Sequence, residues 1–447
     1  MHVGCPWGEA QEFMASEQQR HTRQLTRRGG RHDPARHSLR GTGYFRRLGP
    51  GIVTGAADDD PSGIGTYSQV GAATGNRLLW SGPLLLPLAF AVQEACARLA
   101  LVTGTGLAGI IRTRLPRPLL YLCVALVAIA NTVNIAADLG SMAAALQLLV
   151  PVPQALGVIG FAAIIAVAEV FVPYHRYAKI LRWLCLSLLA YFAVLFVAHV
   201  DWPAVANGIV IPQMQWTKLE VSFLIALAGT TISPYLFFWQ AAEEVEERRQ
   251  TKARYVTKRH MGAMRVDVFA GMFTGVFAMM AIMITAAATL HANGITDVQT
   301  AEQAASALAP IAGDYAGVLF LLGIMGTGLL SVPVLAGATS YAIAETFGWR
   351  ESLERRPSQA RAFYAIILIS ILLGLGLNFV GVNPIQFLFI AALTNGLAAP
   401  VLLGVIWWLA RDRGLLGKWR SPWWSQALVG VAVLAMGLLP VAWLLAP

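Results

Sequence analysis

The chain has 447 residues, of which 56% are hydrophobic and 13% are charged, and its mean hydropathy is +0.59. This composition excludes an ordinary soluble domain, in which about a quarter of the residues are charged. The formal net charge is +9, but the basic residues are spread over several separate segments between apolar stretches. We therefore expect a lipid bilayer, and no nucleic acid, as the partner of this chain.

Apolar stretches recur along the whole chain after residue 48. A helix needs about 20 residues to cross the hydrocarbon core of a bilayer, and we predict eleven membrane-spanning helices. They cover, in order, residues 49–74, 79–112, 118–150, 155–173, 180–200, 217–245, 265–291, 315–346, 362–380, 384–410 and 423–445. The sequence therefore predicts an all-α integral membrane protein.

The connections between these stretches predict its orientation. Residues 1–47 are polar and carry nine arginines, so we expect a disordered tail. Every second connection after that tail is also rich in Lys and Arg, whereas the other connections hold only Arg77 and Lys218. Positive charge marks the cytoplasmic side. We predict a multi-pass protein of the inner (plasma) membrane with a cytoplasmic N-terminus and an external C-terminus.

The first predicted span contains the run Asp58-Asp59-Asp60-Pro61-Ser62-Gly63. An acid at the centre of a membrane helix costs about 2.5–3.5 kcal/mol on the insertion scale, so acids persist there when they face water, protein or a cation. Pro61 removes a backbone donor, and a helix broken here leaves carbonyl groups without partners. Carboxylates and free carbonyls at membrane depth indicate a cation site.

A second interruption lies in the sixth span, where residues 228–235 read Ala-Gly-Thr-Thr-Ile-Ser-Pro-Tyr. Two interrupted helices, five spans apart and oppositely oriented, are typical of inverted-repeat transporters. We expect a transporter core at 48–411, with five-helix repeats at about 48–200 and 217–411, and a loop with an eleventh helix at 412–447. The alternative is that Pro61 and Pro234 merely kink packing helices, which leaves the three acids unexplained.

The chain resembles the Nramp divalent-metal transporters at these motifs. Asp60-Pro61-Ser62-Gly63 resembles their first-helix pattern Asp-Pro-Gly-Asn, and the segment from Gly229 to Tyr235 resembles their sixth-helix segment, which ends Met-Pro-His. Residues 97–108 and 137–139 are similar to their second and third helices. The resemblance implies the leucine-transporter (APC-type) fold with broken helices 1 and 6, and transport of divalent cations as substrate. The sequence contains no Cys/His metal cluster, nucleotide-binding loop or nucleophile elbow, so we expect neither an enzyme nor a cofactor.

Three departures from the family pattern bear on the choice of ion. Gly63 stands in place of the asparagine, Ser233 in place of the methionine, and Tyr235 in place of the histidine. In these positions the chain is most similar to the Nramp-related magnesium transporter (NRMT) branch. A thioether favours softer metals, whereas carboxylates, carbonyls and water suit Mg²⁺ and Mn²⁺. A roomier site of oxygen ligands would suit Mg²⁺, which usually keeps several waters.

We predict Asp60 as the principal metal ligand. The carbonyls of Ala57 and Thr230 are the expected backbone contacts, directly or through water, and Ser233 lines the site. Asp59 either supports the site or lines the path to it. An equally good interpretation is that Asp59 is a partner for buried polar groups.

Two further metal-site candidates lie on other spans. Asp138 is an isolated acid in the third span, and such a residue is a functional candidate by default; a structural hydrogen bond to a neighbouring helix is the alternative. Asn395 falls at membrane depth in the tenth span, in the region where the resemblance implies an amide ligand.

These residues predict uptake of Mg²⁺, and of Mn²⁺, by alternating access. Histidine is the usual proton carrier near neutral pH, but no histidine lies at membrane depth in the predicted spans, so we expect no coupling to protons. The alternative is a proton-coupled Mn²⁺/Fe²⁺ symporter, the usual Nramp activity. An organic-solute transporter on the same fold is a third possibility, disfavoured because Asp58, Asp59 and Asp60 would repel a substrate carboxylate.

Overall fold

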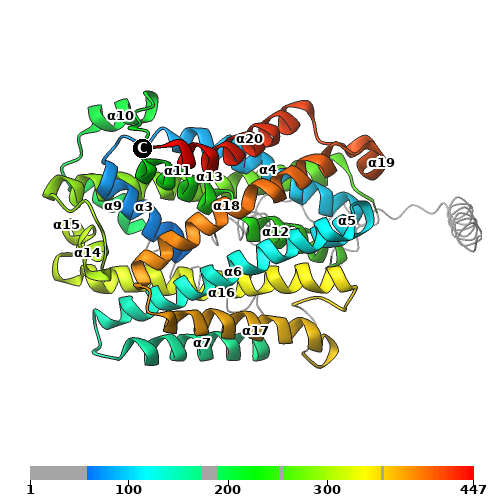
Figure 1. Ribbon diagram of the computed structural model, residues 1–447, viewed down its shortest axis with the longest axis horizontal. Helices are drawn as coiled ribbons and strands as arrows, with labels where there is room; N and C mark the ends of the chain where they lie inside the picture. The colour runs from blue at the N-terminus through cyan, green and yellow to red at the C-terminus, as the bar shows by residue number, and fades with distance from the viewer. Residues whose placement is uncertain (1–57, 173–188, 251–254, 354–356) are drawn as a thin grey trace, which may run out of the picture. The chain divides into compact units, whose positions relative to one another are not determined.

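The computed structural model describes residues 58–172, 189–250, 255–353 and 357–447. Every regular element in these ranges is helical (Figure 1). The helices of eight or more residues are α3 (Pro61–Thr74), α4 (Ser81–Thr103), α5 (Leu107–Arg114), α6 (Arg117–Gln147), α7 (Gln154–Phe171), α9 (Leu189–Val197), α10 (Trp202–Val210), α11 (Lys218–Thr231), α12 (Pro234–Gln250), α13 (Lys258–Thr289), α16 (Ala316–Phe347), α17 (Arg361–Leu377), α18 (Pro384–Arg411) and α20 (Trp423–Leu445). Shorter helices are α14 (Ala301–Ser306), α15 (Ala309–Ala312) and α19 (Arg413–Leu416).

The described part of the chain contains eight helical segments that are long and apolar enough to cross a membrane. They correspond to predicted spans 2, 3, 4, 6, 7, 8, 10 and 11, and α17 is a shorter apolar helix at span 9. Spans 1 and 5 are described only in part, by α3 and α9, and the predicted tail at 1–47 lies outside the described residues. The all-α membrane class is therefore confirmed.

The second span is shorter than predicted. We expected one helix over residues 79–112, but α4 ends at Thr103 and α5 is a separate helix. Gly104 follows α4 with φ of 72°, in the left-handed region that glycine adopts without steric cost, and a helix commonly ends at such a residue.

The predicted break in the sixth span is confirmed. Helix α11 ends at Thr231 and α12 begins at Pro234, because proline lacks the N–H group that would continue the helix. In the first span α3 begins at Pro61, directly after the three acids. The helix predicted before them, over residues 49–57, lies outside the described residues.

The packing of the long helices brings the two breaks to α6 and α18. Helix α6 packs along α16, α17 and α18, while α3 packs on α13 and α18 (Figure 1). Helices α11 and α18 meet backbone to backbone. A Cβ atom added at Gly229 would lie only 2.3 Å from the carbonyl oxygen of Ala392, so there is no room for a side chain there. Likewise, a Cβ atom at Gly396 would lie 2.4 Å from the carbonyl oxygen of Ile225.

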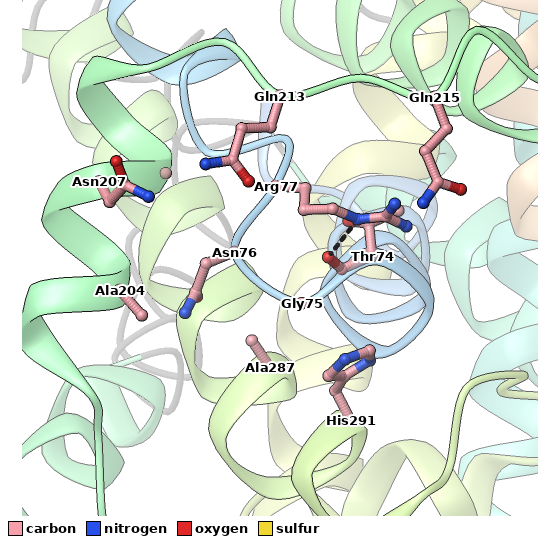
Figure 2. A pocket seen from close by; sticks show the side chains of 11 residues that line it. Thr74, Gly75, Asn76, Arg77, Ala204, Asn207, Gln213, Gln215, Ala287 and His291 are labelled. Carbon is pink, nitrogen blue, oxygen red and sulfur yellow. Dashed lines mark hydrogen bonds between the residues drawn. The ribbon is translucent and has the colours of Figure 1, made fainter.

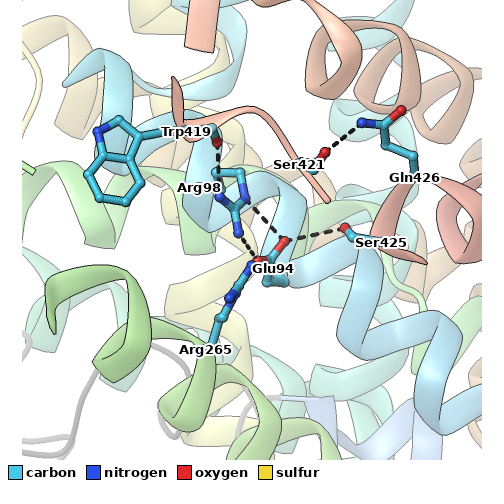
Figure 3. A network of polar contacts seen from close by, with 7 residues as sticks. All are labelled: Glu94, Arg98, Arg265, Trp419, Ser421, Ser425 and Gln426. Atoms are coloured by element: carbon cyan, nitrogen blue, oxygen red, sulfur yellow. Dashed lines mark hydrogen bonds and ion pairs between the residues drawn. The ribbon is translucent and has the colours of Figure 1, made fainter. Parts of the chain in front are cut away.

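A buried ionic network holds α20 against the core (Figure 3). Glu94 of α4 is fully buried and pairs with Arg98 on the same helix and with Arg265 of α13, whose Nε lies 2.8 Å from Glu94 Oε1. Arg98 also donates to the carbonyl of Trp419 at 2.9 Å, and Ser425 donates to Glu94 at 3.4 Å. The network thus joins α4, α13 and the start of α20.

Candidate functional site

The helix-break site is the region where α3 begins and where α11 gives way to α12. We define it by the buried side chains Asp58, Asp59, Asp60, Asp138, Thr230, Ser233 and Tyr235, each of which is at most 4% exposed.

Asp60 occupies the N-cap position of α3, and its two carboxylate oxygens have different partners. Oδ1 accepts from the backbone N–H of Gly63 at 2.8 Å and from the hydroxyl of Ser62 at 2.6 Å. Aspartate is a preferred N-cap residue, and the positive end of the helix dipole stabilises its charge. Oδ2 lies 3.4 Å from the Tyr235 hydroxyl, which donates to it. Capping therefore uses one oxygen and leaves the other directed toward α12.

The carbonyl groups at the end of α11 are not wholly free. The Ser233 hydroxyl lies 2.9 Å from the carbonyl oxygen of Gly229 and 2.6 Å from that of Thr230. The Thr230 carbonyl, which we predicted as a backbone contact for the metal, is therefore partly engaged by Ser233. A carbonyl oxygen has two lone pairs, so Thr230 retains one for a cation, and the negative end of the α11 dipole favours positive charge there.

Asp138 reaches the same region from α6. Its Oδ2 accepts from the hydroxyl of Ser331 on α16 at 2.6 Å, and its carboxyl group interacts electrostatically with Asp60 and with the backbone N–H of Ser62. The structure thus brings Asp138 beside the first turn of α3, although 78 positions separate it from Asp60 in the sequence.

Three of the acids leave a buried oxygen without a hydrogen-bond partner. These atoms are Oδ1 of Asp58, Oδ1 of Asp59 and Oδ1 of Asp138. Within the described residues, the ion pairs involve other acids and none of these three or Asp60. Buried charge without a partner is costly, so the donor set is suited to a cation.

Asn395 contacts α6. Its amide pairs reciprocally with that of Asn134: the Oδ1 atom of Asn395 accepts at 2.9 Å, and its Nδ2 atom donates at 3.2 Å. Asn134 precedes Asp138 by one helical turn, so this pair joins α18 to α6 near the helix-break site. Asn134 donates one hydrogen bond to Asn395 Oδ1. Because an amide oxygen has two lone pairs, the other one stays open for a ligand or a water.

The remaining predicted ligand, Ala57, lies outside the described residues. Across residues 58–172, 189–250, 255–353 and 357–447, no three side chains of His, Cys, Asp or Glu converge closely enough to hold a metal ion by themselves. A cation at Asp60 would therefore complete its coordination with other groups, such as carbonyl, hydroxyl or amide oxygens and water.

Sequence reasoning missed two side chains near the site. Tyr67 of α3 lies over Gly63, so the space left by the absent side chain at position 63 is filled, and the site is less roomy than the sequence suggests. The thioether of Met142 lies against Gly328 of α16, close to the ring of Pro61. Both residues lie about one helical turn from a motif residue, Tyr67 from Gly63 and Met142 from Asp138, and this spacing is a signal that could have found them.

A separate cavity of about 480 Å³ lies at the other end of α3 (Figure 2). Its polar lining comes from three parts of the chain: Thr74, Asn76, Arg77, Asn207, Gln213, Gln215 and His291. Arg77 pairs with Glu220 of α11 at 2.8 Å. None of the predicted metal-site residues lines this cavity.

Comparison with known proteins assigns the chain to a family. The family model described as "Natural resistance-associated macrophage protein-like", Nramp, matches residues 51–446. The chain belongs to the Nramp family. Like other Nramp proteins, it is a multi-pass membrane transporter of divalent metal ions and not an enzyme, and the metal is its transported substrate.

Individual Nramp relatives are distant in sequence but similar along most of their length. The divalent metal cation transporter MntH of Aeromonas hydrophila is 28% identical over 398 residues, which cover 87% of this chain and 92% of the relative. Among solved structures, the Eremococcus coleocola manganese transporter in complex with an aromatic bis-isothiourea substituted compound matches with a TM-score of 0.70 at 17% identity. The matched region covers 90% of this chain and 87% of the transporter chain.

The fold is shared more widely. Mhp1, a nucleobase-cation-symport-1 family transporter in a closed conformation, matches with a TM-score of 0.54 at 14% identity. The matched region covers 89% of this Nramp chain and 90% of the Mhp1 chain.

Proposed function

We propose that this Nramp protein carries Mg²⁺, and also Mn²⁺, into the cell by alternating access and without proton coupling, as a member of the NRMT branch. One observation carries the proposal: the contact across the two helix breaks is made by oxygen atoms, from Asp60 Oδ2 to the Tyr235 hydroxyl. Ser233, where a thioether ligand would otherwise stand, contributes another hydroxyl. Oxygen ligands suit Mg²⁺ and Mn²⁺.

In this proposal Asp60 is the principal metal ligand. The carbonyls of Ala57 and Thr230 and the side chain of Ser233 complete the first contacts, directly or through water. Asp59, Asp138 and Asn395 act around them. The unpartnered buried oxygens of Asp59 and Asp138 support these roles, because a divalent cation would compensate their charge.

We also propose the leucine-transporter (APC-type) architecture, with eleven spans, a 5+5 inverted repeat over 48–411 and an appended helix at 412–447. The packing supports this organisation. An inverted repeat that relates span 1 to span 6 and span 2 to span 7 requires equivalent pairings, and α3 packs on α13 as α12 packs on α4. In the same way, α6 packs on α7 as α16 packs on α17.

Membrane potential alone can drive such uptake. Moving a divalent cation inward across 100 mV, inside negative, supplies about 4.6 kcal/mol, at about 2.3 kcal/mol per charge. Tyr235 contacts Asp60 where the family pattern has a histidine, and a phenol is a poor proton carrier near pH 7. An inward Mg²⁺ transporter therefore needs no proton.

The second candidate is proton-coupled Mn²⁺/Fe²⁺ symport. Three observations favour it. The more similar of the two solved structures described above is of a manganese transporter, the Met142 thioether lies close to Pro61, and Asp138 has an unpartnered buried oxygen that is able to bind a proton.

One experiment separates the two candidates. Purified protein in liposomes, with a pH-sensitive dye inside and an imposed inside-negative potential, is given Mg²⁺, Mn²⁺ or Ca²⁺ outside. The proposal predicts influx of Mg²⁺ and Mn²⁺ without acidification, and mild dependence on pH between about 6 and 8, where neither carboxylates nor phenols ordinarily titrate. Acidification that accompanies metal influx and disappears in Asp138→Asn would establish the second candidate instead.

A further inference from the structure

The phenol of Tyr67 lies over Gly63 in the first turns of α3. A Cβ atom added at Gly63 would lie 3.2 Å from Cε2, Cζ and Oη of Tyr67. Tyr67 follows Gly63 by one helical turn, and aromatic side chains on a helix point back over the preceding turn. The ring therefore runs back along α3, and its hydroxyl end lies beside Gly63, close to the helix N-terminus.

This hydroxyl also connects the two helix breaks. It interacts with the side chain of Thr230 on α11, and electrostatically with Asp58, Asp59 and Asp60. Tyr67 is 1% exposed, so its hydroxyl is available to the interior of the protein and not to bulk solvent.

A second phenol reaches Asp60 from the opposite break, because Tyr235 of α12 donates to Asp60 Oδ2. A phenol hydroxyl can donate one hydrogen bond and also accept. One such group, Tyr235 of α12, thus contacts the carboxylate that we propose as the principal ligand, and the other, Tyr67 of α3, lies beside Gly63, three residues from it in the sequence.

The hydration of the ion gives these hydroxyls a role. Mg²⁺ dehydrates reluctantly and usually keeps several waters when it binds a protein. A buried water typically makes about three hydrogen bonds to polar groups, so a site for a partly hydrated ion must supply partners for the waters as well as ligands for the metal.

We propose that Tyr67 is a specificity-determining residue of the helix-break site, whose hydroxyl hydrogen-bonds a water that the transported ion retains and whose ring fills the volume beside Gly63. The inference rests on the proposed transport of Mg²⁺. It predicts that loss of the hydroxyl impairs transport of Mg²⁺ more than that of Mn²⁺, because Mg²⁺ releases its waters less readily.

The test compares Tyr67→Phe with wild type in the liposome uptake assay, with Mg²⁺ and Mn²⁺ supplied separately below saturation. Tyr121→Phe on α6 is the matched control, because that phenol is half exposed on the outer surface of the helix bundle. We expect the ratio of Mg²⁺ to Mn²⁺ uptake to fall about fivefold to tenfold in Tyr67→Phe, the effect of one lost hydrogen bond, and to stay unchanged in the control.

The outcomes separate this inference from the proposed function. Wild-type Mg²⁺ uptake together with an equal loss of both ions in Tyr67→Phe would overturn the inference alone. Absence of Mg²⁺ uptake by the wild type would overturn the proposed function and the inference with it.

A second variant keeps the inference testable if Tyr67→Phe does not fold. Gly63→Ala retains the hydroxyl but forces it to move by a few tenths of an ångström. We expect the ratio of Mg²⁺ to Mn²⁺ uptake to fall in this variant as well, and an unchanged ratio would contradict the proposal.

Discussion

At the scale of single residues, Asp60 combines a structural and a functional role on separate oxygen atoms. Oδ1 caps α3 through Gly63 and Ser62, and Oδ2 faces Tyr235. Asparagine caps helices about as well as aspartate, so an amide at this position can keep the cap and remove the charge. The two roles can therefore be tested separately.

We expect Asp60→Asn to abolish uptake of divalent cations while the protein stays folded, because the ligand charge is lost but the cap is kept. Asp60→Ala should also abolish uptake and destabilise the fold by about 1 kcal/mol through loss of the cap. Liposome uptake and the thermal midpoint of the purified variants measure both effects. Wild-type uptake by a folded Asp60→Asn protein would refute the assignment of the ligand.

Ser233 is the residue at which ion preference can be changed. Ser233→Met introduces a soft thioether donor and removes the hydroxyl that contacts the Gly229 and Thr230 carbonyls. We expect Mg²⁺ uptake to fall by about tenfold relative to Mn²⁺ or Cd²⁺ uptake, because thioethers favour softer metals. Competition between Mg²⁺ and Cd²⁺ in the liposome assay measures this shift, and an unchanged preference would show that selectivity lies elsewhere.

At the scale of secondary-structure elements, the position of the α11 break depends on its close crossing with α18. Gly229 and Gly396 allow the two backbones to touch. Thr230 directly follows Gly229 and Asn395 directly precedes Gly396, so both site residues lie beside this crossing. Side chains larger than hydrogen at this crossing would separate the helices.

We expect Gly229→Ala to lower the thermal midpoint and reduce uptake, because its Cβ atom would lie 2.3 Å from the Ala392 carbonyl oxygen. Overpacking of this kind typically costs about 1–3 kcal/mol. Gly404→Ala on α18 is the control, since a Cβ atom there meets nothing within 4 Å. Equal stability of the two variants would show that the crossing tolerates a wider separation.

The position of α20 depends on the buried ionic network around Glu94. Glu94→Gln would leave Arg98 and Arg265 without their carboxylate, and removing one partner of a buried ion pair costs about 3–5 kcal/mol. We therefore expect a large fall in the thermal midpoint. Arg114→Gln, which removes an exposed pair with Asp412 at 3.6 Å, should change it little. Similar midpoints for both variants would contradict the role of the network in holding α20.

At the scale of the whole molecule, the basic connections meet at one end of the helix bundle. Arg248 at the end of α12 donates to the carbonyl of Leu101 at 2.6 Å, and Arg249 lies 3.6 Å from Glu351. Arg114 and Asp412 join two further connections. These contacts are consistent with the predicted cytoplasmic side, because the Lys- and Arg-rich connections that they join, all within the described residues, lie at this end.

We expect cysteine labelling to confirm this orientation. Asp314→Cys, in an exposed connection that lacks basic residues, should react with a membrane-impermeant maleimide on intact cells, whereas Arg413→Cys should react only after the cells are opened. Both native side chains are exposed, so a difference reports sidedness and not burial. The reverse pattern would invert the predicted topology.

The sequence by itself determined the class of the protein and the position of its chemistry. Apolar stretches predicted the long helices because a bilayer requires about 20 apolar residues for each crossing. Asp60-Pro61 and Ser233-Pro234 predicted the helix starts at α3 and α12, because proline cannot continue a helix from the preceding turn. Both signals are local and need no knowledge of neighbouring helices.

Only the tertiary structure decided which distant groups share the site. Asp138 reaches Asp60 because α6 packs on α3, and Tyr235 contacts Asp60 because the two breaks face each other. The use of the α11 carbonyls by Ser233 depends on the dihedral angles at Ile232, and the filling of the space beside Gly63 depends on the rotamer of Tyr67. Helix packing and side-chain rotamers set these contacts, and hydrophobic periodicity along one chain carries no information about either.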